Sequence, residues 1–334
     1  LEGEFKKYGL EPGNGDSYYQ DVPLVSITTT PSEEMTISSA SESITLEGFK
    51  DFVLWSQRTN PELSFEDAEL VFAGFGIVAP EYGWDDYKNI DVKDKIVVVL
   101  VNDPGFGTED ESFFKGNTMT YYGRWTYKYE EAIRQGAMGV LIVHNTIPAG
   151  YGFNVIQKSW KASKLYLDDR EKENYKLLIE GWITLPTANK LFEMAGMNDR
   201  EMLAKARKAD FQAVQMNLKA SSTLSVEAEY NVSKNVVAKV TGTKSPDEVI
   251  VYTAHWDHFG IGAPDETGDS IYNGALDNAS GTAALLAIAR AFAEEEEIER
   301  TVVFLAVTAE EQGLWGSAYY AENPIYPKEK TVAN

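Results

Sequence analysis

The chain has 334 residues and a formal net charge of −22, from 52 Asp and Glu against 30 Lys and Arg. This acidic balance argues against a nucleic-acid partner, because phosphate binding needs clustered Lys and Arg. Cysteine is absent, which excludes disulfides and thiolate zinc sites, and no apolar run approaches the length of a membrane-spanning helix. The length predicts two domains, and 43% apolar residues are enough to bury ordinary cores.

The first part of the chain is predicted to be rich in short strands. An amphipathic helix at 1–8 is followed by a turn-rich stretch and by strands at 18–28, 35–37 and 43–46. The chain opens on Leu1, inside the expected helix, and carries no signal sequence. We therefore expect an upstream region to be missing.

The composition changes at Glu69, where long apolar segments begin. The predicted elements are, in order, a strand segment within 70–80, a strand at 96–101, a helix at 127–135, a strand at 140–144, and helices at 185–195 and 199–209. Two features here are interpreted as structural. Gly74-Phe75-Gly76 lacks the third glycine and the following helix of a dinucleotide fingerprint, so a strand turning at a glycine is preferred. His144 has no acidic neighbour at ligand spacing, which favours a packed histidine over a metal ligand.

The C-terminal third alternates strands and helices. Strands are predicted at 224–230, 235–243, 249–254 and 301–308, a helix at 282–294, and a long polar loop at 260–274. His255 ends one strand, Glu310 and Glu311 follow another, and Asp277 precedes the helix, which Asn278-Ala279-Ser280-Gly281 can cap. In open α/β sheets this is the edge where ligands bind.

These residue types match the ligands of a catalytic zinc site, which takes imidazole nitrogen and carboxylate oxygen and keeps one position open. We expect His255, Asp277 and Glu311 to supply three ligands. A second metal about 3.5 to 4 Å away would need a bridging carboxylate, and Asp277 is the candidate because a helix N-terminus lies behind it. Since adjacent side chains of an extended segment point opposite ways, Glu310 is expected to stay free as a general base.

Two further residues are predicted to support the site. Asp257 could accept a hydrogen bond from the His255 ring nitrogen that is not on the metal, which would fix the tautomer. His258 is interpreted as a residue behind the ligands or in the cleft rather than as a ligand.

Three segments, taken together, resemble the successive metal-site motifs of the M28 family of zinc exopeptidases: Ala254-His255-Trp256-Asp257-His258, Gly274-Ala275-Leu276-Asp277-Asn278-Ala279-Ser280-Gly281 and Thr308-Ala309-Glu310-Glu311-Gln312-Gly313. The resemblance implies His255 and Glu311 as terminal zinc ligands and Asp277 as the bridging ligand. It also implies Glu310 as the catalytic acid/base and Asp257 as the carboxylate behind His255.

The middle region, roughly 69–219, resembles the protease-associated domain that is inserted in several M28 peptidases. The resemblance implies an α/β fold, namely a three-layer α/β/α zinc-exopeptidase domain with a mixed central sheet, interrupted by a β-rich insert. The expected domains are 1–68 as the N-terminal part of the peptidase domain, 69–219 as the insert, and 220–334 as the part with the metal site.

The family has two more zinc ligands, an Asp on the next strand and a distant His, but no histidine follows Glu311 here. We therefore expect a fragment that is inactive alone, with two zinc ions in the complete enzyme and the remaining ligands beyond Asn334. The resemblance further implies peptide substrates and a secreted or periplasmic location.

The function that follows is hydrolysis of a terminal peptide bond by a metal-bound water, with Glu310 as general base. An aminopeptidase is preferred over a metallocarboxypeptidase of the same family. Two rival functions stay open: a catalytically inactive, receptor-like binding homologue, and a glutaminyl cyclase, which usually lacks the inserted module.

Overall fold

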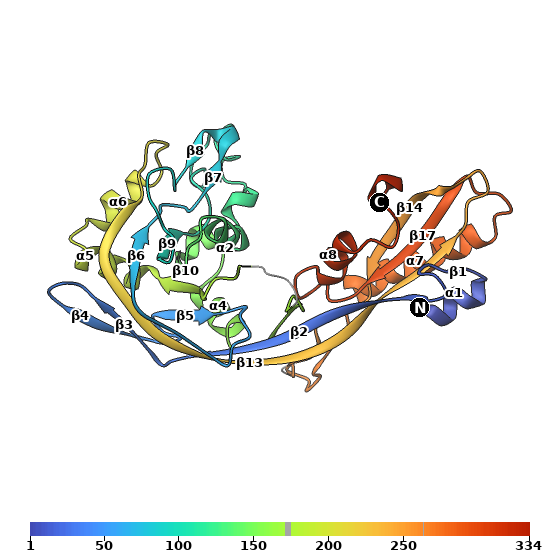
Figure 1. Ribbon diagram of the computed structural model, residues 1–334, viewed down its shortest axis with the longest axis horizontal. Helices are drawn as coiled ribbons and strands as arrows, with labels where there is room; N and C mark the ends of the chain where they lie inside the picture. The colour runs from blue at the N-terminus through green and yellow to red at the C-terminus, as the bar shows by residue number, and fades with distance from the viewer. Residues whose placement is uncertain (171–174, 263) are drawn as a thin grey trace. The chain divides into compact units, whose positions relative to one another are not determined.

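The chain folds into two compact units, shown in the computed structural model of Figure 1, which describes residues 1–170, 175–262 and 264–334. Unit 1 consists of Leu1–Ser26, Lys164–Arg170 and Glu229–Asn334, and unit 2 of Ile27–Ser163 and Glu171–Ala228. These units divide the chain at other positions than the predicted domains, because residues 27–68 pack with the middle region and residues 164–170 with the terminal segments. The identity of the middle region as a protease-associated domain stays a prediction.

Unit 1 is built on a mixed sheet. Its central strands are β14 (Ser245–His255) and β17 (Arg300–Val307), which run parallel, with β18 (Thr331–Ala333) parallel to β14 on one side and the C-terminal part of β13 (Val214–Val240) antiparallel to β17 on the other. The register pairs His255 with Val307, so both central strands end at the same edge. The expected α/β class with a mixed sheet is confirmed.

Helices cover both faces of this sheet. The apolar side chains of β17 point alternately to the two faces, so each face has apolar side chains against which helices pack. Phe304 and its neighbours on one face pack with α1 (Glu2–Tyr8) and α7 (Ser280–Ala293), through core residues that include Phe5 and Leu285. On the other face Leu305 belongs to a valine-rich cluster against which Tyr320 of α8 (Trp315–Glu322) packs. Unit 1 therefore has the predicted three layers.

The segment 164–170 lies apart in sequence from the rest of unit 1. Its strand β11 (Lys164–Leu167) pairs with β2 (Tyr19–Pro31). Leu165 and Leu167 pack with Trp315 and Ala309, beside the turn that follows β17. The indole Nε1 of Trp315 donates to the main-chain oxygen of Leu165 at 2.5 Å. This strand therefore supports the turn that carries Glu310 and Glu311.

Unit 2 contains a second mixed arrangement of strands, in the order β13, β6, β9, β10, β12, β5. The pairs β6–β9, β9–β10 and β10–β12 are parallel, whereas β13–β6 and β12–β5 are antiparallel. The β3–β4 hairpin also pairs with β13. Gly74 and Gly76 turn the chain after β6 at φ of 55° and 64°, as expected for a turn at glycine. The bounds are β3 Glu34–Ser38, β4 Ser43–Glu47, β5 Phe52–Trp55, β6 Glu62–Phe72, β9 Ile96–Leu100, β10 Gly139–His144 and β12 Ile179–Thr184.

The predicted helices of the middle region are present, with shifted ends. They are α2 (Trp125–Arg134), α5 (Leu185–Met194) and α6 (Asp199–Lys205), the last shorter than expected. In contrast to the two strands predicted at 224–230 and 235–243, β13 continues without a break over 27 residues. The remaining elements are β1 Glu11–Pro12, β7 Val78–Ala79, β8 Trp84–Asp85, α3 Thr146–Ala149, α4 Phe153–Ser159, β15 Gly260–Ile261 and β16 Ile271–Tyr272, with short helical turns at Pro80–Tyr82, Tyr121–Gly123, Ala275–Ala279 and Lys328–Lys330.

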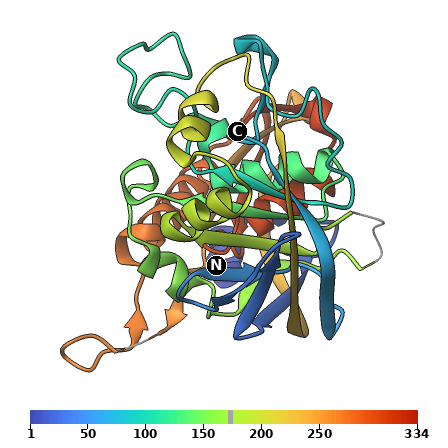
Figure 2. The same ribbon diagram turned by 90° about the vertical axis from the view of Figure 1, so that its left-hand side faces the viewer.

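The loop predicted at 260–274 contains the antiparallel β15–β16 hairpin, whose strands stand clear of the main sheet of unit 1 in Figure 2. Among the helices of the described residues, none combines the length and hydropathy needed to cross a bilayer.

Candidate metal centre

Three segments of unit 1 converge at the edge where β14 and β17 end. His255 is the last residue of β14, and Glu310 and Glu311 follow β17 by a few residues. Asp277 lies in the irregular turn Ala275–Ala279, directly before α7, with a cis peptide bond to Asn278. Thr282 of α7 donates its hydroxyl to the main-chain oxygen of His255 at 2.9 Å, which ties the helix to the strand end.

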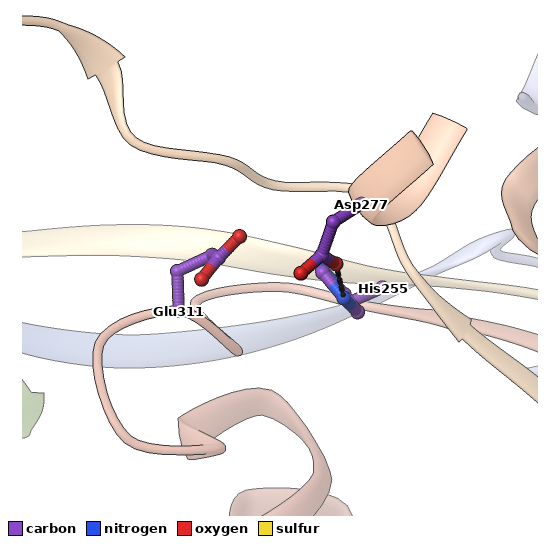
Figure 3. A group of neighbouring side chains, drawn as sticks. All are labelled: His255, Asp277 and Glu311. Carbon is purple, nitrogen blue, oxygen red and sulfur yellow. Dashed lines mark ion pairs between the residues drawn. The ribbon is translucent and has the colours of Figure 1, made fainter. Parts of the chain in front are cut away.

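The structure brings the three predicted ligands together, as Figure 3 shows. One ligand atom from each of His255, Asp277 and Glu311 lies within 4.8 Å of the other two, and His255 Nε2 is 3.0 Å from Asp277 Oδ1. One imidazole and two carboxylates are the donor types of a catalytic zinc site. The residues present therefore fit zinc by their chemistry.

The hydrogen bonding of His255 directs one ring nitrogen toward the other ligands. Nδ1 lies 3.2 Å from the main-chain oxygen of Asp257, which can only accept, so Nδ1 carries the proton of the neutral ring. Nε2 then presents a lone pair to Asp277 Oδ1, which is also an acceptor. Two acceptors at 3.0 Å need a proton or a metal ion between them.

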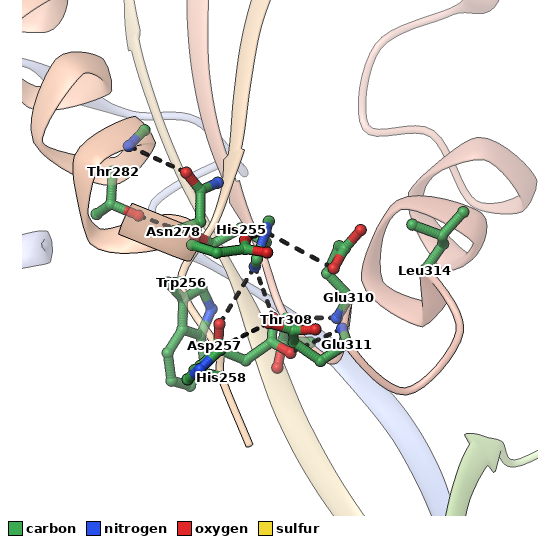
Figure 4. A network of polar contacts seen from close by, with 12 residues as sticks. His255, Trp256, Asp257, His258, Asn278, Thr282, Thr308, Glu310, Glu311 and Leu314 are labelled. Carbon is green, nitrogen blue, oxygen red and sulfur yellow. Dashed lines mark hydrogen bonds and ion pairs between the residues drawn. The ribbon is translucent and has the colours of Figure 1, made fainter. Parts of the chain in front are cut away.

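Glu310 and Glu311 face different partners (Figure 4). Glu310 Oε2 is 3.6 Å from His255 Nε2, whereas Glu311 Oε1 is 2.6 Å from His258 Nδ1. The side chain of Glu310 is 31% exposed and that of Glu311 is 11% exposed. The more accessible carboxylate thus belongs to the predicted general base, and the more enclosed one to the predicted ligand.

Asp257 occupies a position that the sequence did not predict. Its carboxylate lies 3.9 Å from His255 Nδ1, beyond hydrogen-bonding distance, and the contact to that nitrogen comes instead from the Asp257 main-chain oxygen. The two carboxylate oxygens accept the main-chain N–H groups of Glu310 at 3.0 Å and Glu311 at 3.2 Å. The expected hydrogen bond is therefore replaced, because the turn after β17 presents two unpaired N–H groups to the carboxylate.

The turn itself is held by buried polar residues that sequence reasoning missed. Fully buried Asn235 accepts from the Thr308 main-chain nitrogen at 3.0 Å and donates to the Gly316 oxygen at 2.9 Å. A Cβ at Gly316 would come within 2.3 Å of the Thr308 oxygen, so only glycine permits this approach. An Asn that opens an apolar strand segment was the available signal, since a buried amide has to satisfy both its donor and its acceptor.

A cleft of about 680 Å³ opens beside these residues. His255, Asn278, Glu310 and Leu314 contribute to its lining, together with apolar side chains of β14, β17 and α8. Leu314 is 55% exposed. The cleft therefore joins the polar centre to an accessible apolar wall.

His144, the histidine that was predicted to be structural, lies in unit 2. It is buried, and its Nε2 is 2.9 Å from the main-chain oxygen of Tyr151. Burial lowers the pKa of the imidazole. The ring packs edge-on against Phe153 at 5.5 Å between centroids, which accounts for its place in a core.

Comparison with known proteins finds a family that the C-terminal segment resembles. Residues 235–334 match the sequence model of Peptidase family M28. The match contains all three motifs on which the resemblance rested, so that resemblance is confirmed.

Curated relatives match over the same part of the chain. A probable zinc metalloprotease of Leptosphaeria maculans is 42% identical over 87 residues, which are 26% of this chain and 20% of the relative. A probable zinc metalloprotease of Pyricularia oryzae is 43% identical over 88 residues, which are 26% of this chain and 17% of the relative. The matched region thus spans about a fifth of the length of these curated relatives.

Solved structures are similar over nearly the whole chain, at low identity. An aminopeptidase from Aneurinibacillus sp. strain AM-1 has 22% identity and a TM-score of 0.46, covering 99% of this chain and 61% of that protein. BSAP, a zinc aminopeptidase from Bacillus subtilis, has 18% identity and a TM-score of 0.38, covering 98% of this chain and 58% of that protein.

Proposed function

We propose that the full-length protein is a zinc-dependent exopeptidase, and specifically an aminopeptidase. The observation that carries the proposal is the meeting of His255, Asp277 and Glu311, with two acceptor atoms 3.0 Å apart, inside a segment that matches peptidase family M28. His255 and Glu311 would hold zinc as terminal ligands. Asp277 would bridge two ions, because its exposed carboxylate has two oxygens to offer.

Zinc held by these residues would supply Lewis acidity, which polarises the scissile carbonyl and makes water easier to deprotonate. Glu310 would accept a proton from the attacking water at its partly exposed carboxylate and return it to the leaving amine. One carbon–oxygen bond forms and one carbon–nitrogen bond breaks, and the proton ends on the new amino group. His255 would keep its ring oriented through the Nδ1 contact with Asp257.

The charge of the chain supports cleavage at the amino end. Four carboxylates, those of Asp257, Asp277, Glu310 and Glu311, surround the centre, and the chain as a whole carries a formal charge of −22. Two zinc ions would offset the charge of these four carboxylates, so the preference rests on the remaining acidic charge of the chain, which attracts a free α-amino group and repels a free α-carboxylate. A secreted or periplasmic location accompanies this proposal only as what the resemblance to the M28 family implies.

The test is made on the full-length protein with chromogenic peptides that have one end blocked. We expect about two zinc ions per chain by elemental analysis, and cleavage only of the peptide with a free amino end. Cleavage of the peptide with a free carboxyl end would reassign the protein as a carboxypeptidase. A folded protein without zinc or turnover would contradict the proposal and favour a receptor-like binding protein.

A further inference from the structure

His258 makes a contact that neither the zinc ligand set nor the proton transfer uses. Its Nδ1 lies 2.6 Å from Glu311 Oε1, and the two side chains are 22% and 11% exposed. A carboxylate can only accept, so the ring nitrogen carries the proton of this bond. A charge-assisted bond of this length in a partly enclosed place is among the stronger hydrogen bonds.

Glu311 is consequently held at both ends. Its main-chain nitrogen donates to Asp257 Oδ2 at 3.2 Å, and its carboxylate is held by His258 (Figure 4). With Oε1 engaged by the imidazole, Oε2 keeps its lone pairs for a ligand. The side chain of a glutamate loses considerable rotamer freedom when it is fixed, so a carboxylate that His258 orients would lose less of it on binding a metal.

The ring of His258 is itself seated by the segment that carries Asp277. A Cβ built on Gly274 would come within 2.8 Å of the His258 ring, and Gly274 has a φ of 62°, so glycine is required there. The ring also packs against Phe259 at 4.8 Å between centroids. Gly274 directly precedes the turn Ala275–Ala279. His258 thus connects the chain segment of Glu311 with that of Asp277.

We propose that His258 is a positioning residue, which orients the Glu311 carboxylate for metal binding through its Nδ1–H and holds it next to Asp277. The assignment rests on the proposed zinc centre and deepens it. Partners behind metal ligands typically change metal affinity by about 10- to 100-fold when they are removed. The effect is therefore expected in zinc binding itself, apart from turnover.

The experiment measures the zinc dissociation constant of the full-length protein by competition with a chromophoric chelator. His258→Leu removes the donor at similar volume, and we expect zinc affinity to fall about 10- to 100-fold. His258→Asn places an amide N–H₂ where Nδ1 was, and we expect it to recover most of the affinity. If His258 acted through packing alone, Asn, which can donate a hydrogen bond, and Leu, which has nearly the same shape but cannot, would change zinc affinity alike.

A matched control is His144→Asn, which makes the same change in a buried histidine of unit 2 that contacts a main-chain oxygen. It is expected to lower the melting temperature without changing zinc affinity. Wild-type affinity in His258→Leu would overturn the assignment. Equal loss in both His258 variants would also overturn it, and would identify the imidazole as a ligand. Absence of zinc from the wild-type protein would instead refute the proposed function, and this assignment with it.

Discussion

Two clusters of ionisable side chains, one in each unit, differ in how their charges are satisfied. In unit 2, Asp86, Asp103 and Lys128 are buried almost completely. Asp86 Oδ2 accepts the main-chain N–H groups of Phe75 at 3.1 Å and Ile77 at 3.0 Å. Lys128 donates to the main-chain oxygen of Asn102 at 2.9 Å, and Asp103 accepts from both the main chain and the hydroxyl of Thr120.

The cluster in unit 1 is partly open to solvent and has an excess of one charge. Its ion-pair partners are His255 and His258, and among the residues that the structure describes no Lys or Arg pairs with Asp277, Glu310 or Glu311. Buried charges that hydrogen-bond to the main chain fix a fold, whereas converging carboxylates that lack cations are arranged for a ligand. The contrast predicts that substitutions change stability in unit 2 and chemistry in unit 1.

The largest effect on chemistry is expected from Glu310→Gln. The amide cannot accept a proton at neutral pH, so kcat is expected to fall about 10² to 10⁴-fold. Zinc content should stay unchanged, because Glu310 is not among the three converging ligands. Steady-state kinetics and elemental analysis of the same preparation check both statements. Glu296→Gln, an exposed glutamate in the acidic run after α7, is the control, and equal turnover in both variants would remove Glu310 from the reaction.

In unit 2 the corresponding change is Asp86→Asn, read out as the pH dependence of stability. Burial raises the pKa of Asp86 from 3.8 to about 7. A raised folded-state pKa gives a contribution that is complete below the unfolded value and is lost as pH rises through the folded value. Relative to Asp86→Asn, the wild-type protein should therefore lose stability between about pH 4 and pH 7, by at most about 4 kcal/mol.

Urea unfolding of both proteins across this pH range measures that difference. Asp85→Asn, which makes the same change in the adjacent and only partly buried carboxyl, is the control. A stability difference that does not change with pH would mean that the Asp86 carboxyl ionises as readily in the folded protein as in the unfolded chain. Turnover is expected to be the same in all three proteins at a pH where each is folded.

Much of the centre could be predicted because it depends on strand ends. Parallel strands that end together place the residues that follow them at one edge of the sheet. The register of β14 with β17 pairs His255 with Val307, so His255 and the segment after Val307 lie at the same edge. The position of Asp277 followed from the helix start, where Asn278 Oδ1 accepts the Gly281 main-chain N–H at 3.0 Å. Local patterns were sufficient here because each residue directly joins a regular element.

The remaining features depend on contacts between segments distant in sequence. The pairing of Lys164–Leu167 with β2 leaves no pattern in the local sequence. The sequence analysis predicted two strands in place of the single strand β13, because polar residues interrupt its apolar run near Ser233. The position of the Asp257 carboxylate depends on the path of the turn after β17, where Ala309 has a φ of 53°. A non-glycine residue in that region is uncommon, so propensity would not predict the turn.

The smallest of these effects is expected from Asp257→Asn. This variant separates the role of the Asp257 carboxylate, which accepts from Glu310 and Glu311, from the role of its main-chain oxygen, which contacts His255. The amide keeps one acceptor oxygen, so one of the N–H groups of Glu310 and Glu311 loses its partner, while the main-chain contact to His255 is unchanged. Only Glu311 would lose part of its support in this variant, whereas the contact that orients His255 would remain. Zinc affinity should therefore fall by about 10-fold, which is the lower end of the range for residues that support metal ligands. Asp265→Asn makes the same change in a carboxylate that also accepts main-chain N–H groups, in the exposed loop that carries no proposed ligand. If the two variants bind zinc equally, the carboxylate of Asp257 does not position the ligands, and the chemistry of unit 1 depends on the converging side chains alone.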